Sequence, residues 1–258
     1  KLLVLFKTIP NKEIKNNMSG YISNHRELNI IRSREIIPNV HPNNPSSCLV
    51  RLGNTHVCCS AILEDRVPGF LRNSGKGWLT AEYGMLPSST NERMDREAAK
   101  GKQSGRTQEI QRLIGRSLRC AVNLDVLGEK TIKVDCDVIS ADGGTRTASI
   151  IGGYVSLVRT INQYKKNFNL SKSILTNQIA AISVGVVKGT PCIDLDYIED
   201  SSAEVDCNVV MANDGQFIEF QSTGEEAKFS KKTILDFIDL VESSMPDIFQ
   251  IQNAAIEK

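Results

Sequence analysis

Apolar and polar positions alternate along several short segments of this 258-residue chain. In residues 131–139 every second residue is apolar, which predicts a strand with one buried face. Two apolar segments flank Gly53-Asn54, a strong turn signal, and predict a hairpin over residues 47–63. Further strands are expected at residues 181–187, 192–197, 205–211 and 217–221, with a tight turn at Asn213-Asp214-Gly215 between the last two.

Apolar residues three or four positions apart predict helices between these strands. Residues 107–121 carry one apolar stripe, and residues 147–162 contain small residues that permit close packing. Residues 230–245 form a terminal helix, while residues 140–144 and 200–204 are expected to be a turn and a loop. Hairpins mixed with long helices indicate an α+β fold.

The chain shows no internal repeat and no low-complexity linker. Residues 1–17 are rich in Lys and Asn and lack periodicity, so we expect an N-terminal extension outside the fold and a single domain over residues 18–258. The apolar run at residues 2–6 is too short for a secretory signal and has no cleavage site after it. No apolar run approaches the roughly 20 residues of a membrane span, so no membrane partner is expected.

The seven cysteines lack CxxC spacing, and the three histidines are scattered. This pattern is typical of free thiols in a reducing compartment, and it disfavours a disulfide framework, a zinc site and Ser-His-Asp chemistry. We therefore expect a cytoplasmic protein, with an organelle matrix as the alternative.

Charge is unevenly distributed although the net charge is only +1. Residues 88–119 hold eight Lys/Arg against four Asp/Glu, and residues 190–258 hold fifteen Asp/Glu against four Lys/Arg. A basic zone and an acidic zone suit a site that holds a polyanion near a metal ion. A solvated surface of uneven charge explains the same counts.

Two segments place glycine, arginine and threonine at a predicted helix N-terminus: Gly105-Arg106-Thr107 and Gly143-Gly144-Thr145-Arg146-Thr147. Free backbone N–H groups and the helix dipole favour an anion there, and arginine adds a bidentate charged fork. An ordinary helix cap is the other interpretation of each segment. Neither segment matches a P-loop or a dinucleotide fingerprint.

Acidic residues gather around two predicted strands: Asp194, Asp196, Asp200, Glu204 and Asp206. If the strands pair as a hairpin, Asp200 and Asp206 lie near its loop end and can share a magnesium ion, which takes one or two carboxylates plus water and phosphate oxygens. A solvated acidic face is the alternative.

Basic residues precede the first of the two glycine-arginine-threonine segments: Arg93, Arg96, Lys100 and Lys102. The first three fall at helical spacing and would form a basic face able to follow an RNA backbone. A solvated helix face is equally consistent with this spacing. No aromatic residue is interleaved, so base stacking is not expected here.

Long ungapped blocks of the chain closely resemble the ribonuclease PH family: residues 75–87 (GKGWLTAEYGMLP), 96–119, 134–150 and 194–211 (DLDYIEDSSAEVDCNVVM). The resemblance implies a single α+β domain with mixed and antiparallel sheets packed on helices, and a homohexamer built as a trimer of dimers. It also implies phosphate-dependent 3′→5′ trimming of tRNA precursors and other RNAs with single-stranded 3′ ends, by reversible nucleotidyl transfer that releases nucleoside diphosphates.

The same resemblance assigns roles to individual residues. It implies that phosphate is bound by Arg106, Gly144, Thr145 and Arg146. It implies that Asp200 and Asp206 are catalytic and bind the metal ion, Mg²⁺. It also implies that Arg93 and Arg96 bind RNA. Two departures affect the RNA contacts. Ser88 stands where the family often has a basic residue, and the N-terminal basic pattern survives only as Arg26 and Arg32.

Two other functions remain open from sequence. A non-catalytic RNA-binding ring subunit of the same superfamily would usually lack some of these arginines or aspartates, and this chain has them all. A hydrolytic metal nuclease would not need two anion sites.

Overall fold

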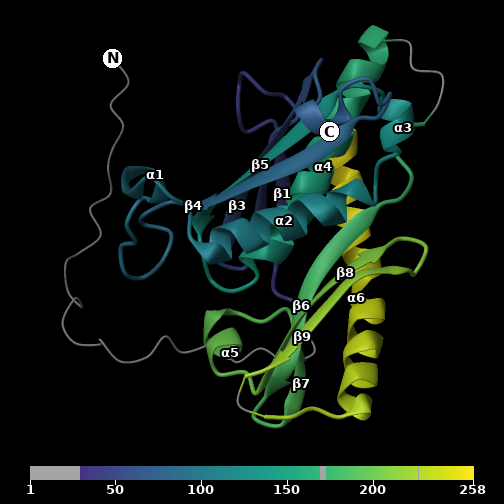
Figure 1. Cartoon of the computed structure of the whole chain (residues 1–258). Coiled ribbons are helices and arrows are strands. Elements are labelled where there is room, and N and C mark those ends of the chain that lie inside the picture. The colour runs from purple at the N-terminus through teal and green to yellow at the C-terminus, as the bar shows by residue number, and fades with distance from the viewer. Residues whose placement is uncertain (1–29, 169–172, 226) are drawn as a thin grey trace, which may run out of the picture.

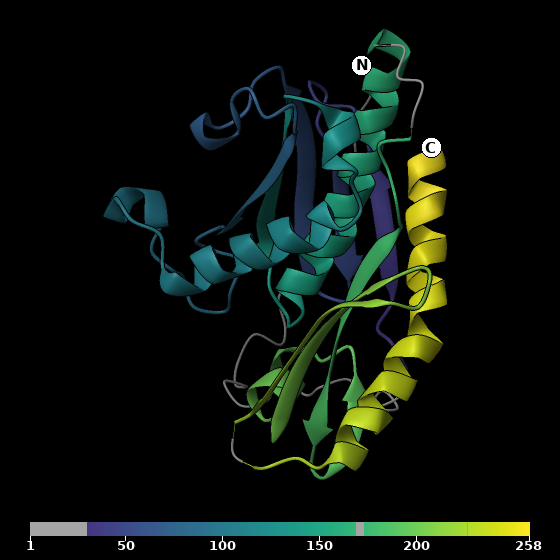
Figure 2. The same ribbon diagram turned by 45° about the vertical axis from the view of Figure 1, so that its right-hand side comes forward.

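The computed structural model describes residues 30–168, 173–225 and 227–258. The expected extension at residues 1–17 lies outside the described residues. The described chain forms two β-sheets, one above the other in Figures 1 and 2, joined by long helices that contact both. Within these residues no helix is both long and apolar enough to cross a membrane.

The first sheet has five strands in the order β1-β2-β3-β5-β4. All neighbours are antiparallel except β4 and β5, which are parallel. The strands are β1 (Arg34–Pro38), β2 (Cys48–Leu52), β3 (Thr55–Glu64), β4 (Trp78–Met85) and β5 (Thr131–Ser140). The expected hairpin is β2–β3. The expected alternation in β5 is confirmed, because Ile132, Val134, Cys136 and Val138 are buried and the positions between them are less so.

The second sheet has four antiparallel strands in the order β7-β6-β8-β9. They are β6 (Ile179–Val187), β7 (Thr190–Ile193), β8 (Val205–Ala212) and β9 (Phe217–Gly224). Because β6 lies between β7 and β8, the hairpin considered for the acidic strands does not form. The strand expected at residues 192–197 ends at Ile193, and the expected loop at residues 200–204 is partly helical.

The helices are α1 (Glu97–Lys100), α2 (Gly105–Arg119), α3 (Leu124–Leu127), α4 (Thr145–Phe168), α5 (Tyr197–Ser201) and α6 (Lys231–Glu257), with a 3-10 turn at Gly69–Leu71. Helix α2 packs on β4, and α4 contacts β2, β3 and β5 of the first sheet and β6 of the second. Helix α6, yellow in Figure 2, runs along both sheets and contacts β1, β6 and β7.

Helix α6 extends twelve residues beyond the expected end at residue 245 and passes through Pro246. Proline breaks an isolated helix, but tertiary packing holds this one. Gln252 is fully buried in the second half of α6, and its amide donates to the backbone oxygens of Ile151 at 3.2 Å and Ile179 at 3.0 Å.

Glycine in α4 allows the close packing that the sequence predicts. A Cβ at Gly152 would lie 2.5 Å from Val50 Cγ2 and 2.6 Å from Cys59 Sγ. The helix can therefore approach β2 and β3 directly, and one hydrophobic cluster runs from the first sheet through α4 into the second sheet.

Candidate functional site

Residues 142–146 form a compact loop that joins β5 to the first turn of α4, and we call it the phosphate loop after the role that the family resemblance implies. Gly143 (φ 71°) and Gly144 (φ 67°) adopt left-handed backbone conformations that glycine accepts without steric cost. Helix α4 begins directly at Thr145, so Thr145 and Arg146 occupy its first turn. The first backbone N–H groups of a helix have no partner within the helix, so this loop directs free hydrogen-bond donors toward the space beyond the N-terminus of α4.

Tyr83 supports the phosphate loop from β4 and was not singled out from sequence. Its hydroxyl lies 2.9 Å from Thr145 Oγ1, and both residues are buried. Burial raises the pKa of Tyr83, while its hydrogen bond to Thr145 and the charges of Arg106 and Arg146 act in the opposite direction. The only sequence signal was its place in a segment of family resemblance, residues 75–87.

The N-terminus of α2 differs from the symmetrical site that the sequence predicts. Ser104 caps this helix, because its side chain accepts from Thr107 N at 3.1 Å. The Thr107 hydroxyl donates to Glu97 Oε1 at 2.8 Å. Thr107 therefore serves the cap, and Arg106 is the group of this segment that remains exposed for an anion.

The two proposed metal-binding carboxylates come from different elements. Asp200 lies in α5, and Asp206 is near the start of β8. Burial, and after it the charge of the neighbouring Asp200, raise the pKa of Asp206 to about 6, although Arg146 and Arg106 act in the opposite direction. Burial also raises the pKa of Asp200, and Arg146, Arg106 and Arg32 oppose that rise.

These mutual effects place the carboxylates and the two arginines in one electrostatic neighbourhood. Two half-buried carboxylates that repel each other suit a cation between them, and the residues therefore fit a magnesium ion held by Asp200 and Asp206. Within the described ranges, no group of three or more His, Cys, Asp or Glu side chains is arranged to hold a metal. Any ion here would take its other ligands from water and substrate.

The remaining acidic residues have structural partners. Asp194 follows β7 with φ 57° and is buried, so it does not share an exposed strand face with Asp196. Asp196 caps α5 in a capping box with Glu199. The Glu204 carboxylate accepts from Gly189 N at 2.8 Å.

The basic segment before α2 is exposed but does not form the predicted helical face. Helix α1 starts at Glu97, so Arg93 and Arg96 precede it in non-helical chain. Asp95 pairs with Lys100 at 3.0 Å and with Arg93 at 3.6 Å. Arg93 and Arg96 are both exposed and therefore accessible to a polyanion.

Of the two N-terminal arginines, Arg26 lies outside the described residues. Arg32 is buried and forms an ion pair with Asp194, with 2.6 Å between Nη2 and Oδ1. Arg32 is therefore part of the interior of the protein and is not an RNA contact.

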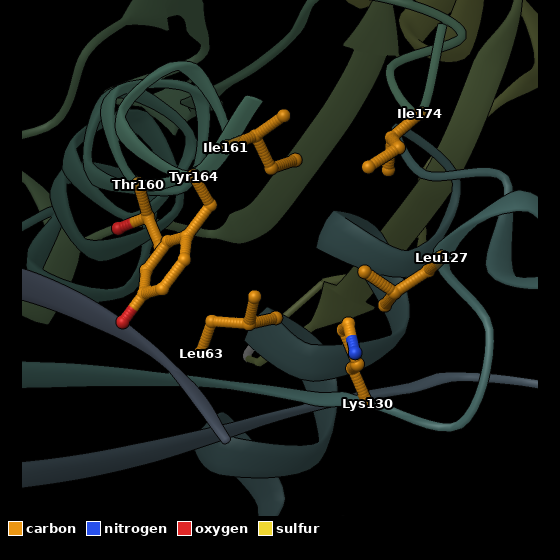
Figure 3. Close-up of a pocket in the computed structure, with 7 residues that line it drawn as sticks. All are labelled: Leu63, Leu127, Lys130, Thr160, Ile161, Tyr164 and Ile174. Carbon is orange, nitrogen blue, oxygen red and sulfur yellow. The ribbon is translucent and has the colours of Figure 1, made fainter. Parts of the chain in front are cut away.

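A small apolar pocket lies elsewhere, between α4 and the end of β3 (Figure 3). Its lining consists of Leu63, Leu127, Lys130, Thr160, Ile161, Tyr164 and Ile174. None of these residues belongs to the anion or carboxylate sites, so the pocket is separate from the candidate site.

Comparison with known proteins gives one consistent family. Two family models match, both of the 3′ exoribonuclease family: domain 1 over residues 30–161 and domain 2 over residues 177–242. The chain is also similar to a protein named ribonuclease PH from Corynebacterium kroppenstedtii. That protein is 49% identical over 242 residues, which cover 93% of this chain and 95% of its own length.

Solved structures share the fold. The crystal structure of rice (Oryza sativa) Rrp46 matches with a TM-score of 0.72 at 17% identity, covering 91% of this chain and 100% of that one. The Archaeoglobus fulgidus exosome with RNA bound to the active site matches with a TM-score of 0.70 at 18% identity, covering 86% and 89%. At these identities the likeness establishes the fold, which is the expected α+β arrangement of sheets packed on helices.

Proposed function

The chain belongs to the 3′ exoribonuclease family, and on that premise we propose that its reaction takes place where the phosphate loop faces Asp200 and Asp206. The chain is a phosphorolytic 3′ exoribonuclease, which uses inorganic phosphate in place of water. The hydrogen bond from the backbone N of Tyr197 to Asp142 Oδ1, at 3.3 Å, supports this location because it joins the loop to α5, the helix that carries Asp200.

Inorganic phosphate binds between the phosphate loop and Arg106 in this proposal. The backbone N–H groups of Gly144 and Thr145 and the Thr145 hydroxyl donate hydrogen bonds, and Arg146 and Arg106 supply positive charge. Tyr83 holds the Thr145 side chain in place through the contact of 2.9 Å. The preorganised donors aim one phosphate oxygen at the terminal phosphodiester.

The reaction exchanges one phosphate linkage for another. An oxygen of inorganic phosphate forms a bond to the phosphorus of the last nucleotide, and the bond from that phosphorus to the 3′ oxygen of the preceding nucleotide breaks. The products are a nucleoside diphosphate and an RNA that is one nucleotide shorter with a free 3′ hydroxyl. Because bonds of similar energy form and break, excess diphosphate drives the reaction backwards.

Asp200 and Asp206 are the residues that would hold Mg²⁺. When bound, the ion offsets the negative charge that gathers on the phosphoryl oxygens of substrate and phosphate. The two carboxylates would hold the positive charge of the ion near Arg106 and Arg146, whose charges act on both carboxylates.

RNA is the macromolecular partner, and Arg93 and Arg96 follow its backbone ahead of the site. We propose tRNA precursors with single-stranded 3′ ends as substrates, processed in the cytosol of a bacterium by a homohexamer. The bacterial relative at 49% identity supports this assignment. The alternative of a non-catalytic ring subunit loses support because Arg106, Arg146 and both aspartates are all present.

A trimming assay tests this function. RNA with a free 3′ end is incubated with the purified chain, with and without phosphate, and with Mg²⁺ or a chelator. Shortening should need both phosphate and Mg²⁺, and the products should be nucleoside diphosphates. Release of monophosphates without phosphate would indicate a hydrolytic nuclease, and no shortening at all would indicate the non-catalytic subunit.

A further inference from the structure

A buried arginine connects the two halves of the candidate site. Arg32 lies just before β1, and Asp194 lies just after β7, 162 residues further along the chain. The Asp194 carboxylate accepts from the backbone N of Arg32 at 2.9 Å through Oδ2 and from Arg32 Nη2 at 2.6 Å through Oδ1. Both side chains are nearly inaccessible, with 7% and 3% exposed.

The other arm of the same guanidinium contacts the phosphate loop. Arg32 Nη1 donates to the backbone oxygen of Asp142 at 2.5 Å. A Cβ added at Gly144 would lie 3.0 Å from Arg32 Nη2, so the guanidinium also lies directly against that residue. One planar fork thus contacts the loop at two positions while it is held by Asp194.

Asp142 completes a connection from the loop to α5. Its Oδ1 accepts from the backbone N of Tyr197, the first residue of α5, at 3.3 Å. Its Oδ2 accepts from Asn54 Nδ2 at 3.0 Å. The loop backbone also packs directly against the residue before α5, since a Cβ at Gly143 would lie 2.6 Å from the carbonyl carbon of Asp196.

These contacts join a loop from the segment matched by the first family model to a helix from the segment matched by the second. The loop carries the donors proposed for phosphate, and α5 carries Asp200. Their relative placement sets how far the phosphate lies from the carboxylates.

We propose that Arg32, held by Asp194 and acting with Asp142, is a positioning residue that fixes the phosphate loop against α5 for phosphorolysis. This inference rests on the proposed function of the loop and of Asp200. Arg32 acts through the loop backbone, because its buried guanidinium is engaged by Asp194 and by the Asp142 carbonyl. Arginine is required because its rigid fork reaches Asp194 and the Asp142 carbonyl at once, which a lysine ammonium cannot do in the same geometry.

The test uses the full chain with three changes at this pair and one control elsewhere. Arg32→Met alone removes the guanidinium that pairs with the buried Asp194 carboxylate and should lower the melting temperature most. Arg32→Met with Asp194→Asn removes both charges, and asparagine tolerates the left-handed backbone of position 194. Arg32→Lys keeps the charge but loses the fork.

The control is Arg159→Met in α4. Arg159 also donates to backbone oxygens, Ala255 at 3.0 Å and Pro45 at 3.0 Å, but it lies fourteen residues beyond the start of α4, about 20 Å away along the helix axis. It should lower the melting temperature without changing the response to phosphate.

Two phosphate readouts separate positioning from stability. The first is the rise in melting temperature caused by inorganic phosphate, which measures phosphate binding without turnover. The second is the KM for phosphate in the trimming assay. We expect the double variant to melt close to wild type, yet to show a KM for phosphate raised about 10-fold or more and a reduced phosphate-induced shift. Arg32→Lys should also raise the KM for phosphate and reduce the phosphate-induced shift, although it should be as fully folded as wild type.

The inference is overturned if the folded double variant or Arg32→Lys keeps the wild-type KM and shift, or if Arg159→Met raises the KM equally. Wild type and Arg106→Ala serve as references for the proposed function itself. If wild type neither needs phosphate nor shifts with it, the proposed function fails. If wild type responds and the Arg32 variants respond equally, only the positioning role fails.

Discussion

Arg106 and Asp206 contribute opposite charges to the same site, and their substitution should have different kinetic signatures. Arg106→Ala removes a charged donor for phosphate worth roughly 1.5–3 kcal/mol, so the phosphate requirement should rise about 10-fold or more, and high phosphate should restore part of the rate. Asp206→Asn keeps the shape but removes the negative charge proposed to hold magnesium, so the maximal rate should fall and only higher Mg²⁺ should help.

A matrix of initial rates over phosphate and Mg²⁺ for wild type and both variants measures these effects. Arg106 is exposed and Asp206 is half-buried, so both variants should remain folded. Rescue of Asp206→Asn by phosphate, together with failure of phosphate to rescue Arg106→Ala, would reverse the two roles.

Asp206 should also make the metal-free protein less stable as the pH rises. Burial, and then the charge of Asp200, raise the pKa of Asp206 from 3.8 to about 6 in the folded chain. Between these values the folded chain keeps a proton that the unfolded chain releases, so stability is lost as the pH rises through this window. Asp206→Asn should therefore raise the free energy of unfolding by about 1 kcal/mol at pH 7, after solvent screening is allowed for. Near pH 4 the same substitution should not change it.

Thermal melts in a chelator at several pH values measure this gain. Asp214→Asn, in the exposed turn between β8 and β9, is the matched control and should show no such gain. A gain from Asp206→Asn that grows as the pH falls would contradict the sign of this prediction.

At the scale of elements, the phosphate loop depends on its contact with the segment before α5. Gly143→Ala places a methyl group 2.6 Å from the Asp196 carbonyl carbon in a residue with φ 71°. Gly75→Ala imposes the same backbone strain at φ 73°, where nothing lies within 4 Å. We expect Gly75→Ala to lower the free energy of unfolding by about 1 kcal/mol. Gly143→Ala should lower it by about 1–3 kcal/mol more, because the added methyl group overpacks the site.

Chemical denaturation measures both changes, and the phosphate-induced shift in melting temperature should be reduced only in Gly143→Ala. Equal losses of stability in the two variants would show that the loop can move away from α5 at no cost.

The segment before α1 should contribute to the binding of long RNA. Changing Arg93 and Arg96 to alanine should lower the slope of binding against salt concentration by up to about two, since each arginine neutralises one phosphate at most. Turnover of a very short oligonucleotide should suffer less than that of a precursor RNA. Alanine at Arg51 and Arg72, which are exposed elsewhere, removes the same charge and is the control.

Filter binding over a salt series measures the slope. If the double variant loses as much turnover on the short oligonucleotide as on the precursor RNA, these arginines do not follow the RNA backbone.

At the scale of the whole molecule, we predict a hexamer. Large apolar side chains are exposed on the single chain, including Phe70 at 71%, Ile62 at 42% and Ile139 at 42%, and burying them would contribute favourably to assembly. Light scattering under reducing conditions should give about six times the chain mass of 28.5 kDa. Cys59 is fully buried and should not bridge subunits, and an active monomer would contradict the prediction.

Local patterns in the sequence were sufficient for most elements, for the family and for its reaction. Alternation in β5 and the apolar stripe of α2 depend only on residues a few positions apart, which is why periodicity predicts them. The ungapped blocks carried the family and its phosphorolytic activity, and both were confirmed. The assignments of Arg106, Arg146, Asp200 and Asp206 remain predictions, although the structure brings all four into one electrostatic neighbourhood.

The tertiary structure decided what depends on partners far apart in the chain. Asp194 belongs to an acidic run and looked exposed, but it turns inward because Arg32, 162 residues away, supplies both its charge partner and a backbone donor. Arg32 belongs to what survives of the N-terminal basic pattern, and it is buried for the same reason. Helix α6 continues through Pro246 because Gln252 finds backbone oxygens in α4 and β6. A side chain's burial follows from what packs against it in space, which spacing along the chain does not record.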